Sequence, residues 1–343
     1  MGVSGALLAI DAGNSKTDVV LAGPDGAVLG AARGGGFQPA RAGVRQAVDG
    51  LAALVERAAA AAAGAAPAAD PATAAAAASP PYVAHVSACL ANCDLPVEEE
   101  LLTAEIAARG WGRTVAVAND TFALLRAGLP DGGEPVGVAV VCGAGINCAG
   151  LGPGGRTARF PAIGRLSGDW GGGACLAEEA LWSAARAADG RGGPSELARA
   201  LPAHFGLDGM PALIEALHLG RVAAERRHEL VPVLFAVAAA GDAVARALVT
   251  RQAEEVVAMA AVALERLGLL GAGVPVVLGG GVLAARHPLL HEQVVALLAG
   301  RAPRAVPVVV TAPPVLGAAL LALDRAGALA AAYARLRAHY GDA

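Results

Sequence analysis

The residues with the clearest chemical potential form a polar turn near the N-terminus, DAGNSKTD, at residues 11–18. The turn holds Lys16, the only lysine in a chain with 26 lysines and arginines. Small residues in a tight turn point backbone N–H groups and hydroxyls in one direction, and such an arrangement binds anions. Asp11 ends the preceding apolar stretch, where a carboxylate can hold Mg²⁺ directly or through water. The turn is therefore a candidate phosphate and metal site, and the alternative is an ordinary polar hairpin.

Two further glycine-rich turns follow predicted strands. CGAGINCAG begins at Cys142, and LGGG at residues 278–281 lies between a strand and the start of a helix. Glycines in the latter turn let a flat ligand such as adenine with its ribose lie directly on the backbone. The chain contains no GxxxxGK[ST] and no GxGxxG that opens a helix after a parallel strand. Nucleotide binding through either of those two motifs is therefore not expected.

Two carboxylates stand at the starts of predicted helices, and each can have either a structural or a functional role. Asp120, in VANDTFALLRAG, can cap its helix or accept a proton from a substrate hydroxyl. Asn119 can provide the cap instead and leave Asp120 free. Asp169, in SGDWGGG, can bind sugar hydroxyls or cap the helix that follows. Trp170 beside it can stack on a sugar ring or pack in the interior, and packing is favoured.

Hydrophobic patterning predicts that one module of secondary structure occurs twice. The first copy has strands at residues 7–10, 17–22, 27–32, 82–88 and 114–118 and helices at 44–63 and 97–110. The second copy has strands at 136–142, 147–151, 156–160, 274–278 and 306–310, helices at 172–188 and 287–299, and more helices between 195 and 268. A final helix is expected over 315–339, and residues 58–78 form an alanine-rich low-complexity segment. Both copies follow the order β-β-β-α-β-α-β, so the turn after the first strand of each is expected to face a shared cleft.

Length and composition favour a two-domain protein with cores of small residues. The chain has 343 residues, of which 55% are hydrophobic and only 3% aromatic. A net charge of −4 does not favour binding to nucleic acid or to an anionic membrane. The two long uncharged runs, at 267–285 and 306–323, contain glycines and prolines that favour strands, loops and helices over a membrane span.

The cysteines and the N-terminus indicate a cytoplasmic protein. The five cysteines have neither the spacing of a disulfide framework nor that of a zinc site. Cys89 and Cys93 are predicted to be buried small residues, with a metal or cluster role as the alternative. The first residues of the sequence lack the features of a signal peptide.

Five motifs in order along the chain resemble those of the N-acetylglucosamine kinase and BadF/BadG/BcrA/BcrD ATPase group: DAGNSKTD, NDTFAL, VCGAGINCAG, SGDWGGG and LGGGV. This group belongs to the superfamily of sugar kinases, Hsp70 and actin, and the resemblance covers about residues 7–325. It implies an α/β fold with two RNase H-like domains around a nucleotide cleft, and ATP with Mg²⁺ as cofactors. The expected domains are residues 1–118 and 119–314, with a helical insert at about 195–268. The C-terminal helix, at about 315–340, can pack back on the first domain.

The resemblance also implies roles for single residues. Asp120 corresponds to the catalytic base and Asp11 to the acid that holds the metal. The phosphates are expected at Gly13, Asn14, Ser15, Lys16, Thr17, Gly143, Ala144 and Gly145, and adenosine is expected at Gly279, Gly280 and Gly281. The sugar is expected at Gln38, Asn119, Asp120, Asn147 and Asp169. Because GAGIN lacks two hydroxyls common in the group and GDWG replaces GDEG, the sequence defines ATP use more closely than the sugar.

The implied function is ATP-dependent phosphorylation of an amino sugar hydroxyl, with N-acetylglucosamine or glucosamine as substrate. A homodimer is expected, with the apolar stretch LVPVLFAVAAA at residues 230–240 as its surface. Two alternatives stay open. One is a non-kinase ATPase that activates a partner enzyme, which requires a [4Fe–4S] cluster held by paired cysteines at a dimer interface. The other is a sugar sensor on a kinase fold.

Overall fold

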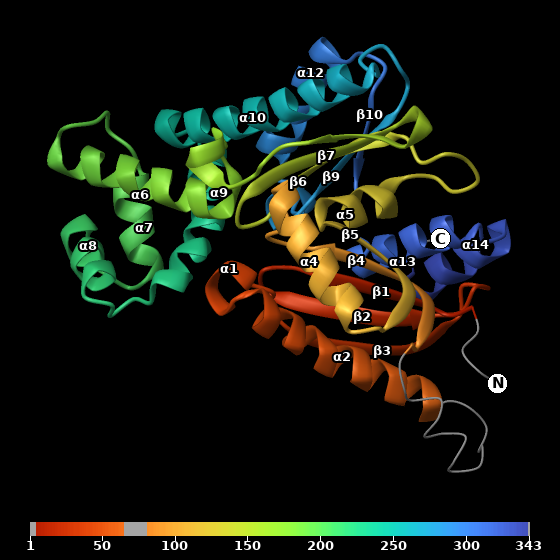
Figure 1. Cartoon of the computed structure of the whole chain (residues 1–343). Helices are drawn as coiled ribbons and strands as arrows, with labels where there is room; N and C mark the ends of the chain where they lie inside the picture. The colour runs from red at the N-terminus through yellow and green to blue at the C-terminus, as the bar shows by residue number, and fades with distance from the viewer. Residues whose placement is uncertain (1–4, 65–80, 342–343) are drawn as a thin grey trace. The chain divides into compact units, whose positions relative to one another are not determined.

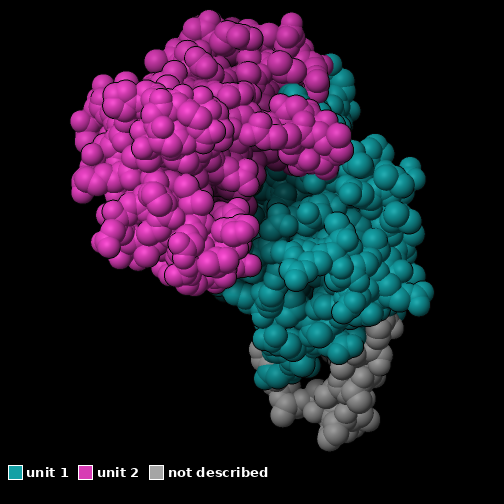
Figure 2. All heavy atoms as spheres, turned by 90° about the vertical axis from the view of Figure 1, so that its left-hand side faces the viewer, with its two compact units in different colours: residues 1–139, 149–161, 310–343 teal, residues 140–148, 162–309 magenta. Residues whose placement is uncertain are grey.

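The computed structural model describes residues 5–64 and 81–341 (Figure 1). It divides into two compact units: unit 1 comprises residues 1–139, 149–161 and 310–343, and unit 2 comprises residues 140–148 and 162–309 (Figure 2). Two five-stranded sheets, each combined with helices, confirm the predicted α/β class. The domain limits predicted from the sequence stay predictions. Of the alanine-rich segment, residues 58–64 continue a helix, and residues 65–78 lie outside the described residues.

The sheet of unit 1 has the strand order β3-β2-β1-β4-β5. Its strands are β1 (Leu7–Ala12), β2 (Lys16–Ala22), β3 (Val28–Gly35), β4 (Val83–Leu90) and β5 (Gly112–Asn119). The first three strands pair antiparallel, whereas β4 is parallel to both β1 and β5. The carboxyl ends of β1, β4 and β5 therefore meet at one edge of the sheet, which brings the residues that follow them together.

Helices cover both faces of this sheet (Figure 1). One face carries α1 (Pro39–Ala42), α2 (Val44–Gly64) and α4 (Pro96–Ala108), and the other carries α5 (Thr121–Gly128), α13 (Pro314–Ala326) and α14 (Ala330–His339). All six residues of β1 are buried. Leu8 and Ile10 pack toward α2, whereas Leu7 and Ala9 pack toward α13, since side chains alternate along a strand. Burial on both faces explains why the first four residues of β1, Leu7 to Ile10, are all apolar.

The second sheet has the strand order β10-β9-β6-β7-β8. Its strands are β6 (Gly137–Cys142), β7 (Ile146–Gly152), β8 (Arg156–Arg159), β9 (Pro275–Gly279) and β10 (Val306–Val309). The helices of unit 2 are α6 (Gly172–Asp189), α7 (Leu197–His204), α8 (Met210–His218), α9 (Leu230–Ala239), α10 (Ala243–Leu267), α11 (Gly281–Ala284) and α12 (Pro288–Arg301). The predicted order β-β-β-α-β-α-β therefore occurs twice, with the expected helical insert in the second copy.

Two expectations about helices were wrong. The predicted single C-terminal helix is two helices, α13 and α14, because the chain turns at Gly327, which has a φ of 62°. The apolar stretch expected to form a dimer surface is α9, most of whose large side chains are buried within unit 2. Among the described residues no single helix is both long and apolar enough to cross a membrane; residues 224–239 and 243–267 meet that criterion only as a pair bent by 112°.

Helices α5 and α13 cross at very short range, which holds the C-terminal segment in unit 1. A Cβ atom on Gly317 of α13 would lie 1.7 Å from the carbonyl oxygen of Ala123 in α5. Beside this crossing, the buried guanidinium of Arg126 donates to the carboxylates of Asp324 (2.7 Å) and Asp131 (2.9 Å). Arg337 of α14 pairs with the same Asp131 at 2.6 Å. These contacts join α5 and the loop after it to α13 and α14, between residues that are 198 and 206 positions apart in the sequence.

We expect Gly317→Ala to destabilise the protein by about 1–3 kcal/mol, because the added methyl group forces two helix backbones apart. Gly50→Ala is the matched control. Gly50 lies in the middle of α2 on its solvent-exposed side, and a Cβ there would meet no atom within 4 Å. Alanine should therefore stabilise the helix by about 0.5–1 kcal/mol. Thermal or urea unfolding measures both effects, and a neutral Gly317→Ala would contradict the close crossing.

Candidate active site

The turn between β1 and β2 is a short hairpin whose tip is exposed. The backbone N–H of Gly13 donates to the carbonyl oxygen of Lys16 at 2.9 Å and closes the turn. Asn14, Ser15 and Lys16 are exposed, whereas Thr17 is buried at the start of β2. The hairpin therefore presents its amide, hydroxyl and ammonium groups on the surface of unit 1. The predicted role of this turn in phosphate binding stays a prediction.

Three carboxylates gather beside this turn. Asp11 on β1 stands directly opposite Asp18 on β2, so their side chains lie on the same face of the sheet. Asp18 is paired with Arg33, at 2.6 Å from Nε and 3.2 Å from Nη2, and with the ammonium of Lys16 at 3.5 Å. Burial, followed by the negative charges of Asp120 and Asp18, raises the pKa of Asp11 to about 8, against the weaker opposing effect of Lys16. Asp11 is thus a buried carboxyl group whose ionised form is only weakly compensated, by Lys16.

This environment fits a bound divalent cation at Asp11. The described residues contain no group of three or more His, Cys, Asp or Glu side chains that could hold a metal. Mg²⁺ commonly uses only one or two protein carboxylates and takes its other ligands from water and substrate phosphates. A cation there would favour the ionised form that burial now disfavours. Asp11 is therefore the residue that would hold Mg²⁺.

Asn119 and Asp120 divide two tasks at the end of β5. The Oδ1 atom of Asn119 accepts a hydrogen bond from the backbone N–H of Thr121 at 2.9 Å, and Asp120 makes no side-chain capping bond. Asn119 therefore fulfils the capping role, as one of the two interpretations anticipated. Burial raises the pKa of Asp120 to about 6, with the backbone N–H groups of Thr121 and Asp120 opposing part of that rise. A carboxylate with a pKa near the working pH is suited to general-base chemistry.

The segment after β3 reaches the same turn. The side chain of Gln38 donates to the backbone carbonyl of Asn14 at 3.2 Å, and the backbone N–H of Phe37 donates to the carbonyl of Gly13 at 2.9 Å. Asn92, which follows β4, bonds to both Asn14 and Phe37 and was not anticipated from the sequence. Its position just after a buried strand next to β1 was the available signal. Unit 1 thus brings together Asp11, the polar turn, Gln38, Asn119 and Asp120.

Three glycine-rich segments of unit 2 also lie against one another. The backbone N–H groups of Gly173 and Ala174, at the start of α6, donate to the carbonyl oxygens of Gly143 (2.8 Å) and Ala144 (2.9 Å). A Cβ atom on Gly172 would lie 2.4 Å from the carbonyl of Gly145, and one on Gly280 would lie 2.4 Å from that of Cys142. The turn at 143–145 is therefore held between the start of α6 and the turn at 279–281.

Gln252 on α10 bonds to two of these segments, and the sequence did not predict this role. It is fully buried; its Oε1 accepts from the backbone N–H of Gly172 at 2.9 Å and its Nε2 lies 3.5 Å from the sulfur of Cys142. A buried amide that satisfies both of its polar ends in this way restrains the loops it joins. No local pattern signals this role, because Gln252 is 80 residues away from Gly172.

The residues predicted to bind the sugar are divided between the units: Gln38, Asn119 and Asp120 belong to unit 1, and Asn147 and Asp169 belong to unit 2. One oxygen of Asp169 accepts bonds from Ser167 Oγ (2.5 Å) and the backbone N–H of Gly164 (3.1 Å). Trp170 is buried, with the guanidinium of Arg251 4.2 Å from its ring centroid. Packing is therefore the role of Trp170, as favoured from the sequence.

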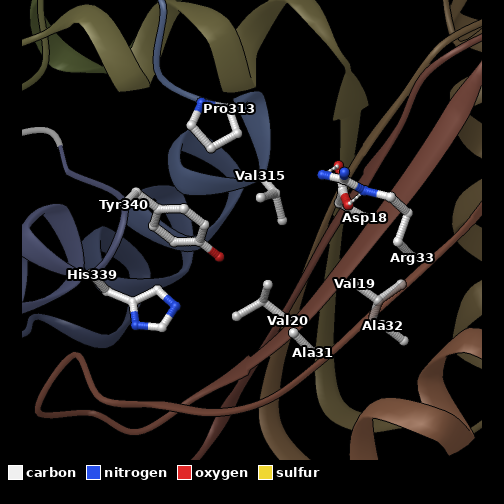
Figure 3. A pocket seen from close by; sticks show the side chains of 10 residues that line it. All are labelled: Asp18, Val19, Val20, Ala31, Ala32, Arg33, Pro313, Val315, His339 and Tyr340. Atoms are coloured by element: carbon white, nitrogen blue, oxygen red, sulfur yellow. Dashed lines mark hydrogen bonds and ion pairs between the residues drawn. The ribbon is translucent and has the colours of Figure 1, made fainter.

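Unit 1 also contains a cavity of about 420 Å³ that is separate from these residues (Figure 3). Its walls include the Asp18–Arg33 pair, Val315 and Tyr340, and the phenol of Tyr340 points into the space. Burial and the charge of Asp18 raise the pKa of Tyr340 to about 12. None of the residues predicted to bind nucleotide or sugar lines the cavity. The carboxylate of Asp18 is nevertheless common to this cavity and to the cluster around Asp11.

The arrangement of motifs agrees with a comparison against protein families. The model of the BadF/BadG/BcrA/BcrD ATPase family matches residues 8–322. The chain belongs to this family. Because this is a family of ATPases, membership implies that the protein uses ATP. Comparison with curated protein sequences finds no match.

Solved structures show the same fold. A proposed N-acetylglucosamine kinase from Chromobacterium violaceum is 24% identical, with a TM-score of 0.68, over 94% of this chain and 99% of that one. A proposed N-acetylglucosamine kinase from Porphyromonas gingivalis is 20% identical, with a TM-score of 0.62, over 92% and 97%. A glucokinase from Streptomyces griseus, in complex with glucose and AMPPNP, is 15% identical, with a TM-score of 0.53, over 93% and 100%. The predicted two-domain kinase fold is thereby confirmed.

The raised pKa of Asp11 predicts a specific dependence of stability on pH. In the unfolded chain the group ionises near its ordinary value of 3.8, whereas in the folded protein it ionises near 8. Between these values the unfolded state has released the proton and the folded state has not, so the contribution of Asp11 to stability falls as pH rises. Asp11→Asn removes this effect. Without added metal, the Tm of Asp11→Asn minus that of wild type should increase by several degrees from pH 5 to pH 8.

The control for this measurement is Glu100→Gln, which changes an exposed carboxylate on α4 of the same unit. Its Tm difference from wild type should stay constant between the two pH values. A constant difference for Asp11→Asn as well would show that Asp11 is not held in its neutral form by burial.

Proposed function

We propose that the protein is an ATP-dependent kinase that phosphorylates a hydroxyl of an amino sugar, N-acetylglucosamine or glucosamine, with Mg²⁺ as the metal. The observation that carries this proposal is the state of Asp120. Its carboxylate is free of capping bonds because Asn119 provides the cap, and its pKa of about 6 suits proton transfer near neutral pH. Family membership supports the use of ATP.

In the proposed reaction, Asp120 accepts the proton of the sugar hydroxyl. The hydroxyl oxygen forms a bond to the γ-phosphorus of ATP while the bond from that phosphorus to the β,γ-bridging oxygen breaks. The products are the sugar phosphate, ADP and a proton that Asp120 later releases to water. The turn at residues 13–17 supplies backbone N–H groups, hydroxyls and the ammonium of Lys16 to the phosphates. Asp11 would hold Mg²⁺, whose charge would stabilise the negative charge on the transferred group.

For the nucleotide, unit 2 offers backbone surfaces rather than charged side chains. We propose that the turn at 143–145 contacts phosphate and that Gly279–Gly281 contact adenosine. Glycine has no side chain, so a ligand can approach its backbone closely, and this supports the proposal. A Cβ atom on Gly143, Gly145 or Gly281 would meet no protein atom within 4 Å, so these glycines border open space. The glycines at 172 and 280, in contrast, are needed for contacts within the protein.

The choice of an amino sugar rests on the names of the similar structures from Chromobacterium violaceum and Porphyromonas gingivalis and on the amide side chains at the predicted sugar residues. Gln38 and Asn147 can donate to and accept from sugar hydroxyls and an N-acetyl carbonyl. Asn119 was also predicted to bind the sugar, but its amide is used within unit 1, where its Oδ1 accepts from Thr121 and its Nδ2 donates to Asp94 at 2.8 Å. The direct test is release of ADP from ATP·Mg²⁺ with a panel of hexoses, amino sugars and N-acyl sugars. ADP release that no sugar stimulates would contradict a sugar kinase.

The cysteines do not favour the alternative of an activator with a shared [4Fe–4S] cluster. Such a cluster needs two accessible thiolates from each subunit. Cys89, Cys93, Cys142 and Cys148 are buried, and burial raises the pKa of each thiol, which keeps it protonated. Of the five, Cys175 alone is partly accessible.

We also propose that the protein is a homodimer, as the resemblance implies. The burial of α9 leaves other apolar side chains as the candidate surface, notably Trp182 on α6 and Ile214 and Leu219 at α8. Light scattering at micromolar concentration should give the mass of two chains, and the mass of one chain would contradict the proposal. The cytoplasmic location inferred from the cysteines stays a prediction.

Asp120→Asn should lower kcat by about 10²–10⁴-fold, because asparagine has the same size but cannot accept the proton. The Kd for ATP should stay within about threefold of wild type, and the Tm should change little, since Asn119 keeps the cap. Asn119→Ala should show a different pattern, with about 1 kcal/mol lower stability from the lost cap. An Asp120→Asn variant that melts early but keeps its turnover would make Asp120 a structural residue.

A further inference from the structure

Asn92 has an unusual backbone conformation at the point where β4 ends. Its φ is 58°, and among the described residues other than glycine it shares a positive φ only with Ala162 and Arg286. Asparagine tolerates this left-handed region better than most residues, although glycine adopts it more readily. The conformation directs the side chain at two neighbouring segments. Its Nδ2 donates to Oδ1 of Asn14 at 3.0 Å and to the backbone carbonyl of Phe37 at 2.9 Å.

The bond to Asn14 holds the tip of the polar turn, and the bond to Phe37 holds the segment after β3. Residues 14–16 are exposed, so the tip of the turn is not fixed by packing in the core. Besides Asn92, the turn contacts the segment after β3 through the bond from Gln38 to the Asn14 carbonyl, the bond from the Phe37 N–H to the Gly13 carbonyl, and the close approach of Gly36. A Cβ atom on Gly36 would lie 2.0 Å from the carbonyl oxygen of Asn14. The turn and residues 36–38 are therefore in direct contact, and Asn92 is bonded to both.

We infer that Asn92 is a positioning residue that joins the polar turn and the segment at residues 36–38, so that nucleotide and sugar strengthen each other's binding. The inference rests on the proposed kinase function. In that function the turn contacts phosphate and Gln38 contacts the sugar. A sugar that orders Gln38 also orders Phe37 and, through Asn92, the side chain of Asn14. Because the turn is then already fixed, ATP binds with less loss of conformational freedom, and the coupling acts equally in both directions.

The decisive variant is Asn92→Gly, which removes the side chain but accommodates a φ of 58° without strain. The Tm should therefore stay within about 3 °C of wild type. The Kd for AMPPNP with Mg²⁺, an ATP analogue that does not transfer its γ-phosphate, should rise about tenfold by calorimetry, since that is the effect of losing one to two net hydrogen bonds. In wild type, saturating N-acetylglucosamine or glucosamine should lower this Kd. In Asn92→Gly the sugar should lower it less, because only the contacts of Gly36, Phe37 and Gln38 with the turn remain. The KM for ATP should rise more than kcat falls.

Two glycine variants on β3 and just after it complete the test. Gly36→Ala keeps Asn92 but displaces the carbonyl of Asn14, so it should reproduce the weaker coupling. Gly35→Ala is the matched control, because a Cβ there would meet no atom within 4 Å, and it should bind ATP as wild type does.

The outcomes separate this inference from the function it rests on. Wild-type protein that binds no ATP would overturn the kinase function and the inference together. Wild-type protein that phosphorylates a sugar while Asn92→Gly keeps normal ATP affinity and normal coupling would overturn the inference alone. A fall of more than about 10 °C in the Tm of Asn92→Gly would also overturn it, because Asn92 would then be needed for folding.

Discussion

The concentration of negative charge beside β1 is the constraint on which the rest of unit 1 depends. Asp11 and Asp18 face each other across a pair of strands, and Asp120 contributes a third carboxylate. Removing such groups from water costs several kcal/mol per ion unless cations compensate. Lys16 and Arg33 compensate Asp18, but Asp11 keeps a pKa of about 8. A fold that maintains this unfavourable arrangement at the carboxyl edge of a sheet has a site where a bound cation would be stabilised.

Unit 2 meets a different constraint, which is the close approach of backbone to backbone. Gly172 and Gly280 both have positive φ, and each approaches the turn that starts after β6 so closely that no side chain fits. The amide of Gln252 then holds the start of α6 in place. The loop edge that results consists of backbone, which suits a ligand recognised by shape and by N–H groups more than by charge. The two units thus differ in chemistry: unit 1 carries carboxylates and a lysine beside its turn, and unit 2 carries exposed glycine backbone.

The sequence revealed local features well because they depend on local physics. Apolar runs predicted the strands, and the repeated order of elements predicted two modules. The contacts that depend on distant residues could not be read in the same way. Gln252 and Asn92 look like ordinary polar residues on a helix and in a turn, and only the folded chain brings them to Gly172 and Asn14. The apolar α9 illustrates the same limit, since hydrophobicity alone does not distinguish a core helix from a surface for a partner.

The pair Asn119–Asp120 shows how the order of two similar residues can determine chemistry. The helix start needs one side-chain acceptor, and Asn119 satisfies it by accepting the N–H of Thr121. If the two residues were exchanged, a carboxylate would accept that bond, favoured by the positive end of the helix, and its pKa would fall. An amide, which cannot accept a proton, would then stand where Asp120 stands. The present order assigns the neutral residue to the cap and leaves the ionisable one with a pKa raised by burial to about 6, against a smaller lowering by the backbone N–H groups of Thr121 and Asp120. The same dipeptide would therefore cap the helix in either order, but only the present order places an ionisable group after the capping residue.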